Sequence, residues 1–372
     1  MINVKDFVNY LKNINIDFFT GVPDSQLSSF VDYIEKNCKN IIAANEGNAL
    51  GIASGYNLST NKFPLVYLQN SGLGNIVNPI SSLTHSEVYS IPVVYLIGWR
   101  GQPGVHDEPQ HIKQGAITLD LLELLDIDYT VITKETDFGD LKEIFENKFI
   151  RQLNDGKSVA IVVSKDAFEE YKIKKYNDNS LTRELAIQTI VDFLSDEDMI
   201  ISTTGKSSRE LFEYREDLKQ GHGNDFLTVG SMGHSSSIAL GVSLNTPNKR
   251  IFCFDGDGAI LMHMGSLALI GSMNPKNFYH ILFNNSAHES VGGLPTIMSD
   301  ICIDELVLAC GYNKVYNASS VDELYDVLPN FIEDNGPVFL NIDVNLESRK
   351  DLGRPTTLPI ENKLEFMKKL RS

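Results

Sequence analysis

The sequence predicts an α/β protein built from two doubly wound, parallel-sheet domains of similar size. Short runs rich in β-branched residues alternate with helical patterns along the whole chain, which is typical of parallel sheets covered by helices. A polar stretch, KIKKYNDNS at residues 172–180, separates two halves that both show this alternation. A chain of 372 residues is long enough for two complete cores. We therefore expect domains at residues 1–175 and 181–372.

The first half opens with MINVKDFVNYLKNINIDFF, an amphipathic helical pattern without the continuous apolar segment of a signal peptide. Further helices are expected at residues 47–56 and 140–152. The expected strands of this half cover residues 40–44, 65–69, 92–97, 129–133 and 159–164.

The second half repeats this rhythm and ends in a basic loop and a short helix over residues 349–372. Its expected strands are residues 199–203, 226–229, 250–254, 279–284 and 337–344. Its expected helices are residues 181–194, 235–244, 265–273, 304–311 and 321–333. The shared rhythm suggests a duplicated architecture, although the two halves show no residue-level repeat.

Composition excludes several classes of function. The formal net charge of −17 argues against nucleic acid or an anionic membrane as the main partner. No apolar run reaches the roughly 20 residues of a membrane-spanning helix. The four cysteines lack metal-ligand CxxC spacing, and we expect reduced thiols in a cytoplasmic protein.

The most informative motif is FDGDG, which closes one predicted strand, followed by a double asparagine that closes the next. It places hard oxygen donors at two consecutive strand ends, where ligands bind in open α/β sheets. We expect Asp257, Asn285 and the carbonyl of Ala287 to hold Mg²⁺ carrying a diphosphate. The amides of Gly258 and Ala259, at a helix start, would contact phosphate oxygens. The alternative is a simple turn.

This motif pair resembles the signature of thiamine diphosphate-dependent enzymes. The resemblance implies a catalytic glutamate in the other domain, after a strand and at a helix start, and Glu46 in IIAANEGNALGIASGY is placed in this way. In the family this carboxylate hydrogen-bonds the pyrimidine ring of the cofactor and activates it. Taken alone, Glu46 could be an acid favoured by the dipole of the helix it begins.

A third element agrees with the resemblance. In the family a bulky apolar residue at the position of Met232 holds the cofactor bent, and the carbonyl of Gly230 contacts its amino group. Gly205 and Ser207 are further expected cofactor contacts. Taken alone, Met232 would be a core methionine.

The order of these motifs implies a pyrimidine-binding domain followed by a diphosphate- and Mg²⁺-binding domain that carries the C-terminal tail. The middle domain of larger relatives is missing. The family usually builds its sites from two subunits, so a homodimer or higher homo-oligomer is expected.

Other stretches resemble phosphonopyruvate decarboxylases in particular: GVPDS, GWRGQPGVHDEPQH, TTGKSSREL, MHMGSL, NNSAHESVGGLPT and RKDLGRPTTLP. The resemblance implies decarboxylation of 3-phosphonopyruvate to 2-phosphonoacetaldehyde and CO₂, in phosphonate biosynthesis of the 2-aminoethylphosphonate type. The alternatives are a sulfopyruvate decarboxylase, another compact 2-oxo acid decarboxylase, or a non-catalytic cofactor-binding scaffold. A nucleotide-binding module is disfavoured, because the chain has neither GxGxxG nor a Walker motif.

Decarboxylation requires a later protonation, which histidines or partly buried carboxyl groups can supply. The candidates are Asp24 in a turn, His111 in the loop of residues 101–115, which could close on substrate, and His288 after the metal motif. Turn and loop polarity alone would also explain these three residues. The position of the family's usual glutamate after the metal loop is occupied by Val291.

A phosphonate needs cations or amide donors. The expected substrate contacts are Ser25, Lys206, Arg209, Arg349 and Arg354. The alternative is a capped helix start and a solvated basic tail.

Overall fold

The computed structural model describes residues 1–372, except for the side chain of residue 290. The chain forms two compact units, Met1–Lys174 and Lys175–Ser372. Each unit contains one six-stranded sheet in which every pair of neighbouring strands is parallel. The predicted class, two doubly wound parallel-sheet domains, is confirmed.

The sheet of the first unit has the strand order β2-β1-β3-β4-β6-β5. Its inner strands β3, β4 and β6 are buried almost end to end, because helices cover both faces of a parallel sheet. The strands are β1 Phe18–Gly21, β2 Lys39–Ile42, β3 Leu65–Gln69, β4 Val94–Gly98, β5 Asp128–Ile132 and β6 Val159–Val163.

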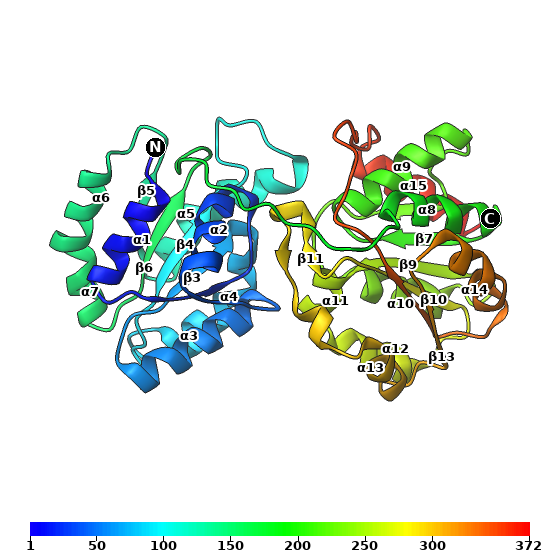
Figure 1. The fold of residues 1–372 in the computed structure, drawn as a ribbon, viewed down its shortest axis with the longest axis horizontal. Coiled ribbons are helices and arrows are strands. Elements are labelled where there is room, and N and C mark those ends of the chain that lie inside the picture. The colour runs from blue at the N-terminus through cyan, green and yellow to red at the C-terminus, as the bar shows by residue number, and fades with distance from the viewer. The chain divides into compact units, whose positions relative to one another are not determined.

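Helices flank this sheet on both sides (Figure 1). The first, α1, buries one face, with apolar residues at the helical spacing Val4, Phe7, Val8 and Leu11, and the Asn3 side chain caps its start. The α-helices are α1 Val4–Asn13, α2 Ser28–Asn37, α3 Glu46–Thr60, α4 Leu73–Pro79, α5 Pro109–Leu124, α6 Phe138–Ile144 and α7 Ile150–Asn154. Short 3₁₀ or π turns are η1 Ser25–Leu27, η2 Asn70–Gly72, η3 Ile80–Thr84 and η4 Phe145–Phe149.

The sheet of the second unit has the order β13-β14-β10-β9-β7-β8. Read from the β8 edge, the order is β8-β7-β9-β10-β14-β13, which follows the same pattern along the chain as β2-β1-β3-β4-β6-β5 in the first unit. The suggested duplication of architecture is therefore present in the topology. Its strands are β7 Met199–Ser202, β8 Asp225–Leu227, β9 Ile251–Gly256, β10 Phe278–Asn284, β13 Lys314–Ala318 and β14 Val338–Asp343, and a separate hairpin pairs β11 Ala287–His288 with β12 Leu294–Pro295.

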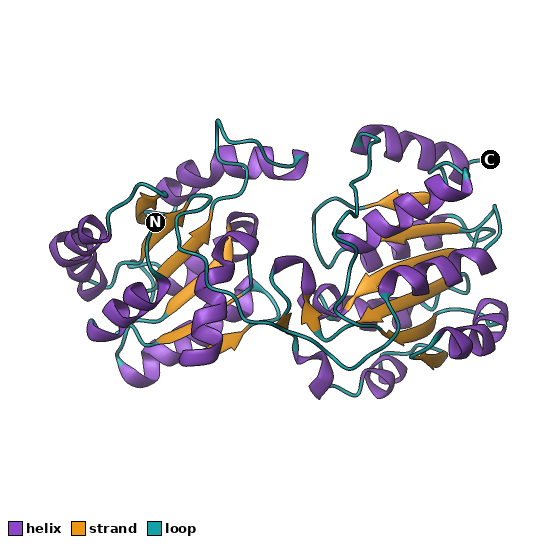
Figure 2. Cartoon of the chain, turned by 45° about the horizontal axis from the view of Figure 1, so that its top comes forward, coloured by secondary structure: helices purple, strands orange, loops and turns teal.

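Helices again lie on both sides of the strands (Figure 2). The α-helices are α8 Arg183–Phe193, α9 Lys206–Leu218, α10 Ser235–Asn245, α11 Asp257–Met262, α12 Gly265–Met273, α13 Ile303–Ala309, α14 Val321–Glu333 and α15 Pro359–Leu370. The 3₁₀ turns are η5 Glu289–Val291 and η6 Ile297–Asp300.

Most predicted elements are present, with ends that coincide or differ by up to four residues, but some predictions need correction. The N-terminal helical pattern forms a helix only over Val4–Asn13, and its last residues belong to strand β1, which was not among the expected strands. The helix expected at residues 140–152 is interrupted by the π turn η4. The strand β13 was not predicted, because it lies at the sheet edge and its residues are mostly half-exposed or exposed, so it lacks a continuous apolar run.

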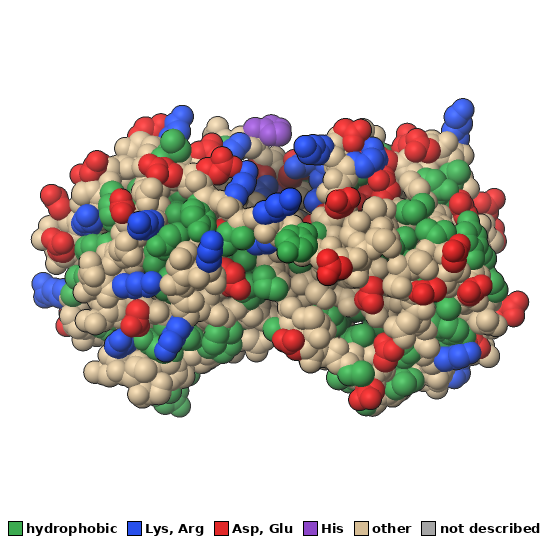
Figure 3. Space-filling model, viewed as in Figure 1, with side chains coloured by type: hydrophobic (Ala, Val, Ile, Leu, Met, Phe, Trp, Pro, Cys, Tyr) green, Lys and Arg blue, Asp and Glu red, His purple; other side chains and the backbone are tan. Residues whose placement is uncertain are grey.

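Charged side chains lie on the surface of both units. Acidic and basic side chains are scattered over both units on the face shown in Figure 3. Among the described residues, no helix is long and apolar enough to cross a membrane.

The packing of α12 yields a stability prediction. A Cβ on Gly271 would lie 1.9 Å from the backbone oxygen of Cys310, whereas a Cβ on Gly241, in α10, meets nothing within 4 Å. We expect Gly271→Ala to cost about 2 kcal/mol or more, because two backbone segments must separate. Gly241→Ala should be neutral or stabilise by about 1 kcal/mol. Thermal denaturation of both variants checks this, and equal midpoints would contradict the packing described.

Candidate active site

In the first unit, Glu46 is the first residue of α3, directly after the β2 strand and its short loop. Asn45 caps the helix by accepting from the Asn48 amide at 2.9 Å. The Glu46 side chain is buried, and its Oε2 accepts from Asn75 Nδ2 at 2.7 Å. A Cβ on Gly72 would lie 2.3 Å from Glu46 Oε1, so only glycine leaves room for this carboxyl group.

The segment that contacts Glu46 begins at the end of β3 and also hydrogen-bonds to Asp24. Gln69 Nε2 donates to Asp24 Oδ1 at 2.7 Å, and Ser71 Oγ donates to Gln69 Oε1 at 2.8 Å. Asp24 is fully buried, and burial raises the pKa of its carboxyl group against the lowering effects of Gln69 and Arg100. The short segment after β3, residues 69–75, therefore contacts both predicted acids, Asp24 and Glu46.

The third predicted group of this unit, His111, was placed incorrectly. It lies in the first turn of α5, not in a loop, because Pro109 at the first helical position starts the helix before it. The expected loop of residues 101–115 is thus a loop only up to residue 108. Burial and the nearby Arg100 lower the pKa of His111.

Ser25 accepts from Arg100 at 3.1 Å. Arg100 is held in turn by Asp107, through contacts of 2.6 and 2.8 Å, and Asp107 also accepts from the Gly101 amide. The predicted substrate contact Ser25 is therefore next to an arginine that the sequence analysis did not single out.

In the second unit, Asp257 is the first residue of α11, immediately after β9. Its side chain is 4% exposed, and Thr296 Oγ1 donates to its Oδ2 at 2.5 Å. Burial raises the pKa of Asp257 to about 6, although hydrogen bonds from Thr296 and from amides, including that of Ala287, act in the opposite direction.

The residues after β10 fold back toward Asp257. Asn285 is buried, and its Oδ1 accepts from the Ala287 amide at 3.0 Å. The Ala287 amide also donates to Asp257, so the structure brings Asp257, Asn285 and Ala287 together, while their role as cation ligands stays a prediction. Their oxygen donors are those that Mg²⁺ prefers.

His288 and Met232 lie against the same glycine. A Cβ on Gly258 would lie 2.9 Å from the His288 ring and 3.1 Å from Met232 Cε. Burial lowers the pKa of His288 to about 4, so its ring is neutral at pH 7. Two other expected cofactor contacts are close in sequence to these residues. Gly230 lies in the segment after β8, shortly before Met232, and Ala259 follows Gly258 in α11.

Two further expected cofactor contacts, Gly205 and Ser207, lie where the chain passes from β7 into α9. Gly205 precedes the helix with a φ of 98°, a left-handed value that favours glycine, and Ser207 is buried in the first turn. These positions leave backbone amides at a helix start beside a strand end, a geometry that suits a phosphate.

A buried network of charges adjoins the loop that carries Asn285. Arg183 binds both Glu210 and Glu289, and Lys206 Nζ lies 2.7 Å from Glu289 and from Ser348. Burial by itself would raise the pKa of Glu289, but the charges of Arg183 and Lys206 lower it overall. Glu289 also accepts from Asn285 Nδ2 at 3.4 Å, which links the network to the predicted metal ligand.

The other predicted substrate cations are engaged elsewhere. Arg209 donates to two backbone carbonyls of the tail. Arg349 pairs with Glu184 on α8 and Glu213 on α9. Arg354 lies exposed in the same tail. Of the cations proposed from sequence, only Lys206 has a hydrogen-bonded partner next to the cation loop in the contacts described.

The residues of the second unit fit a diphosphate held through a divalent cation. The buried carboxyl group of Asp257 is costly when ionised unless a cation neutralises it. A Cβ on Gly258 would crowd the His288 ring and Met232 Cε, so the backbone beside Asp257 carries no side chain there. Sequence reasoning missed the supporting residues Thr296 and Arg183, which are ordinary in sequence and acquire partners only through long-range contacts.

The comparisons with known proteins agree with this geometry. The family described as "Thiamine pyrophosphate enzyme, N-terminal TPP binding domain" matches residues 3–124. The family described as "Thiamine pyrophosphate enzyme, C-terminal TPP binding domain" matches residues 203–342. The two matches fall in different units of the chain.

Three curated relatives extend the match over most of the chain. It is 34% identical to a phosphonopyruvate decarboxylase of Streptomyces viridochromogenes, over 97% of this chain and 93% of the relative. It is 32% identical to the phosphonopyruvate decarboxylase of Streptomyces hygroscopicus, over 97% and 92%. It is 26% identical to a sulfopyruvate decarboxylase of Methanosarcina acetivorans, over 87% and 86%. The chain therefore belongs to the thiamine pyrophosphate-dependent decarboxylases, in the family that includes the phosphonopyruvate decarboxylases.

Proposed function

We propose that this protein decarboxylates 3-phosphonopyruvate to 2-phosphonoacetaldehyde and CO₂, with thiamine diphosphate and Mg²⁺, as a step in phosphonate biosynthesis. The observation that carries the proposal is the match to phosphonopyruvate decarboxylases over 97% of the chain. The reaction breaks one carbon–carbon bond, and one proton takes the place of the lost carboxylate.

The cofactor, when bound, would supply the electron sink for the pair that CO₂ leaves behind. In our proposal Asp257, Asn285 and the Ala287 carbonyl hold Mg²⁺, and the amides of Gly258 and Ala259 donate to the diphosphate. Gly205 and Ser207 form the second phosphate contact. Supporting this arrangement, Asp257, Asn285 and Ala287 converge on adjacent loops.

Glu46 is the proposed catalytic acid–base group of the first unit. Asn75 donates to one of its carboxyl oxygens, which leaves the other, Oε1, to exchange a proton with the cofactor ring. Gly230 and Met232 are proposed to orient the cofactor from the second unit. A Cβ on Gly258 would lie 3.1 Å from Met232 Cε, so this methionine already lies beside the diphosphate loop.

Protonation of the product carbon is proposed to involve Asp24, His111 or His288. Asp24 is favoured, because burial raises the pKa of its carboxyl group and so keeps a proton available at higher pH. Burial lowers the pKa of both histidines, and a neutral His288 is a weaker acid than an imidazolium ion.

The phosphonate is proposed to bind Lys206, with Ser25, Arg209, Arg349 and Arg354 as further predicted contacts. Lys206 is supported by its position beside Glu289, which contacts Asn285. The charge of Lys206 would favour an anionic substituent on the substrate over the methyl group of pyruvate.

We further propose that the enzyme is a homodimer or higher homo-oligomer, because the family usually builds its active sites from two subunits. The assignment of residues 1–175 to pyrimidine binding and of residues 181–372 to diphosphate binding belongs to this proposal. A cytoplasmic location stays a prediction.

The substrate prediction is tested by CO₂ release. With thiamine diphosphate and Mg²⁺, we expect kcat/KM for phosphonopyruvate to exceed those for sulfopyruvate and pyruvate by at least tenfold, a difference of about 1.4 kcal/mol. Higher kcat/KM for sulfopyruvate would instead assign the chain to the sulfopyruvate decarboxylases. As a control, Glu46→Gln should remove turnover of all three acids, and undiminished activity would refute the proposed chemistry.

The geometry around Glu46 gives a second prediction with a matched control. Gly72→Ala places a methyl group against the Glu46 carboxyl group, whereas a Cβ on Gly74 meets nothing within 4 Å. We expect Gly72→Ala to lower kcat roughly 100-fold or more through loss of positioned proton transfer. Gly74→Ala should retain wild-type kcat, and equal effects of the two changes would exclude this contact as the cause.

The raised pKa of Asp257 gives a prediction about pH. Because the folded-state pKa of about 6 exceeds the ordinary 3.8, the metal-free chain loses stability as pH rises through 6, by roughly 3 kcal/mol in all. Asp257→Asn should therefore raise the melting temperature of the metal-free chain at pH 7.5 but not at pH 4.

The same variant should no longer be stabilised by Mg²⁺ with thiamine diphosphate. The exposed Asp300→Asn serves as the control, and it should behave like the wild type in both respects. Full stabilisation of Asp257→Asn by Mg²⁺ and cofactor would remove Asp257 from the metal site.

A further inference from the structure

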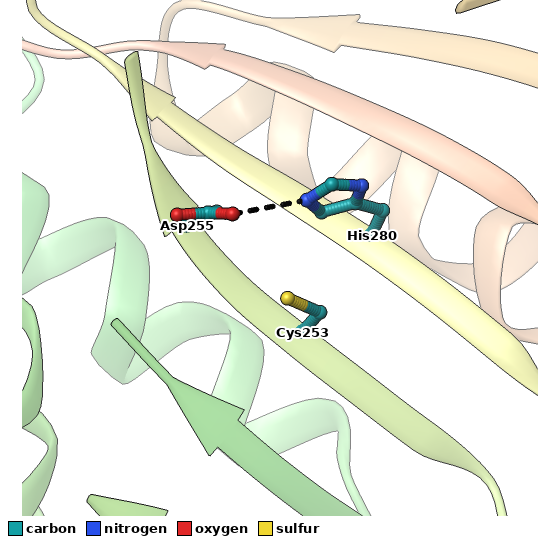
Figure 4. A group of neighbouring side chains, drawn as sticks. All are labelled: Cys253, Asp255 and His280. Atoms are coloured by element: carbon teal, nitrogen blue, oxygen red, sulfur yellow. Dashed lines mark ion pairs between the residues drawn. The ribbon is translucent and has the colours of Figure 1, made fainter. Parts of the chain in front are cut away.

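Three side chains with metal-binding atoms meet inside the second unit, apart from the predicted Mg²⁺ ligands. Cys253 and Asp255 lie on β9, and His280 lies on β10 opposite Cys253 in the strand register. Their ligand atoms all lie within 4.8 Å of one another, and all three residues are fully buried. Figure 4 shows the three side chains grouped over these two neighbouring strands.

Two atoms of this group lack the partners that buried polar atoms normally have. Asp255 Oδ2 and His280 Nε2 are both without a hydrogen bond to any described residue, and they lie 3.5 Å apart. A charge-assisted hydrogen bond would be about 2.8 Å long. In contrast, two O or N ligands about 2.05 Å from a tetrahedral metal lie about 3.3 Å apart, close to the spacing found here.

The remaining contacts orient these atoms toward a common point. His280 Nδ1 lies 2.9 Å from the Tyr312 hydroxyl, which leaves Nε2 as the ring atom facing Asp255. Such a hydrogen bond on the opposite nitrogen is typical of a metal-bound histidine. Asp255 Oδ1 accepts from the Gly256 amide at 3.0 Å, so that only Oδ2 remains available.

A fourth oxygen lies beside this group. Ser235, the first residue of α10, is buried, and its hydroxyl lies within hydrogen-bonding reach of the Cys253 thiol. This contact lowers the pKa of the thiol, which burial otherwise raises strongly. A buried thiol of this kind ionises readily only beside a cation.

We propose that Cys253, Asp255 and His280 form a tetrahedral structural site for zinc, with the Ser235 hydroxyl as the fourth ligand. One thiolate, one carboxylate and one neutral imidazole give Zn²⁺ a net charge of zero, which suits a fully buried position. Mixed S, N and O donors select a borderline transition metal over Mg²⁺, whose oxygen ligands lie on the loops beyond the strand.

The site would fasten β9 to β10 just before the loop that carries Asp257. Through Asp255 and the Gly256 amide, the metal would help to hold the start of that loop. Since the three main ligands are fully buried, zinc would enter during folding and exchange slowly.

The test is to unfold the full chain with chelator and refold it with one equivalent of Zn²⁺ or Co²⁺. We expect about one zinc per chain by elemental analysis after exhaustive dialysis. The Co²⁺ form should show the intense visible bands of a tetrahedral ion and a thiolate charge-transfer band in the ultraviolet. A chain that refolds without retaining zinc and without either band would show that Asp255 and His280 are a metal-free ion pair, and would overturn the proposal.

Variants assign the ligands. Cys253→Ser should remove the thiolate band and His280→Asn should lower zinc content at least tenfold, whereas the exposed Cys302→Ser should change neither. Asp257→Asn should keep its zinc, which separates this site from the Mg²⁺ site. If the ligand variants do not fold, the Co²⁺ spectrum of the wild-type chain still decides the question.

Discussion

The second unit depends on the burial of one carboxyl group, that of Asp257, at the carboxyl end of β9. Burial disfavours the ionised form of this carboxyl group and raises its pKa to about 6. The loop after β10 brings Asn285 and Ala287 beside it, and Thr296 from the following hairpin segment donates to it. Our proposal of a divalent cation rests on this buried carboxyl group and the oxygen donors around it.

The same strand order occurs in both units, but the two sheets carry different chemistry at their carboxyl edges. In each unit a buried acid is the first residue of a helix that follows a strand, Glu46 in α3 and Asp257 in α11. Glu46 has one amide donor and a glycine against it, which suits proton exchange. Asp257 lies among oxygen ligands, which suits a metal. The same strand order can thus carry different chemistry in each unit.

Several of the cations considered as substrate contacts hold the chain's own structure instead. Arg209 donates to two backbone carbonyls of the C-terminal tail. Arg349, in the same tail, pairs with an acid on α8 and another on α9. Arg183 is buried between Glu210 and Glu289. Lys206 is partly exposed and contacts Glu289, which itself contacts Asn285.

The sequence by itself determined the fold class, most strands and helices, and the residues of the two acid motifs. These are local properties: periodicity appears within ten residues, and GDG and the asparagine pair are read directly from consecutive positions. Sequence reasoning failed at the edge strand β13, where the apolar signal is weak, and at His111, where Pro109 begins a helix.

Only the tertiary structure decided which side chains support these motifs. Asn75 meets Glu46, Gln69 meets Asp24, and Thr296 meets Asp257 across 29, 45 and 39 residues of sequence. The group of Cys253, Asp255 and His280 arises from the register of two neighbouring strands. Such partners are chosen by packing and strand register, which depend on the whole chain and leave no local pattern.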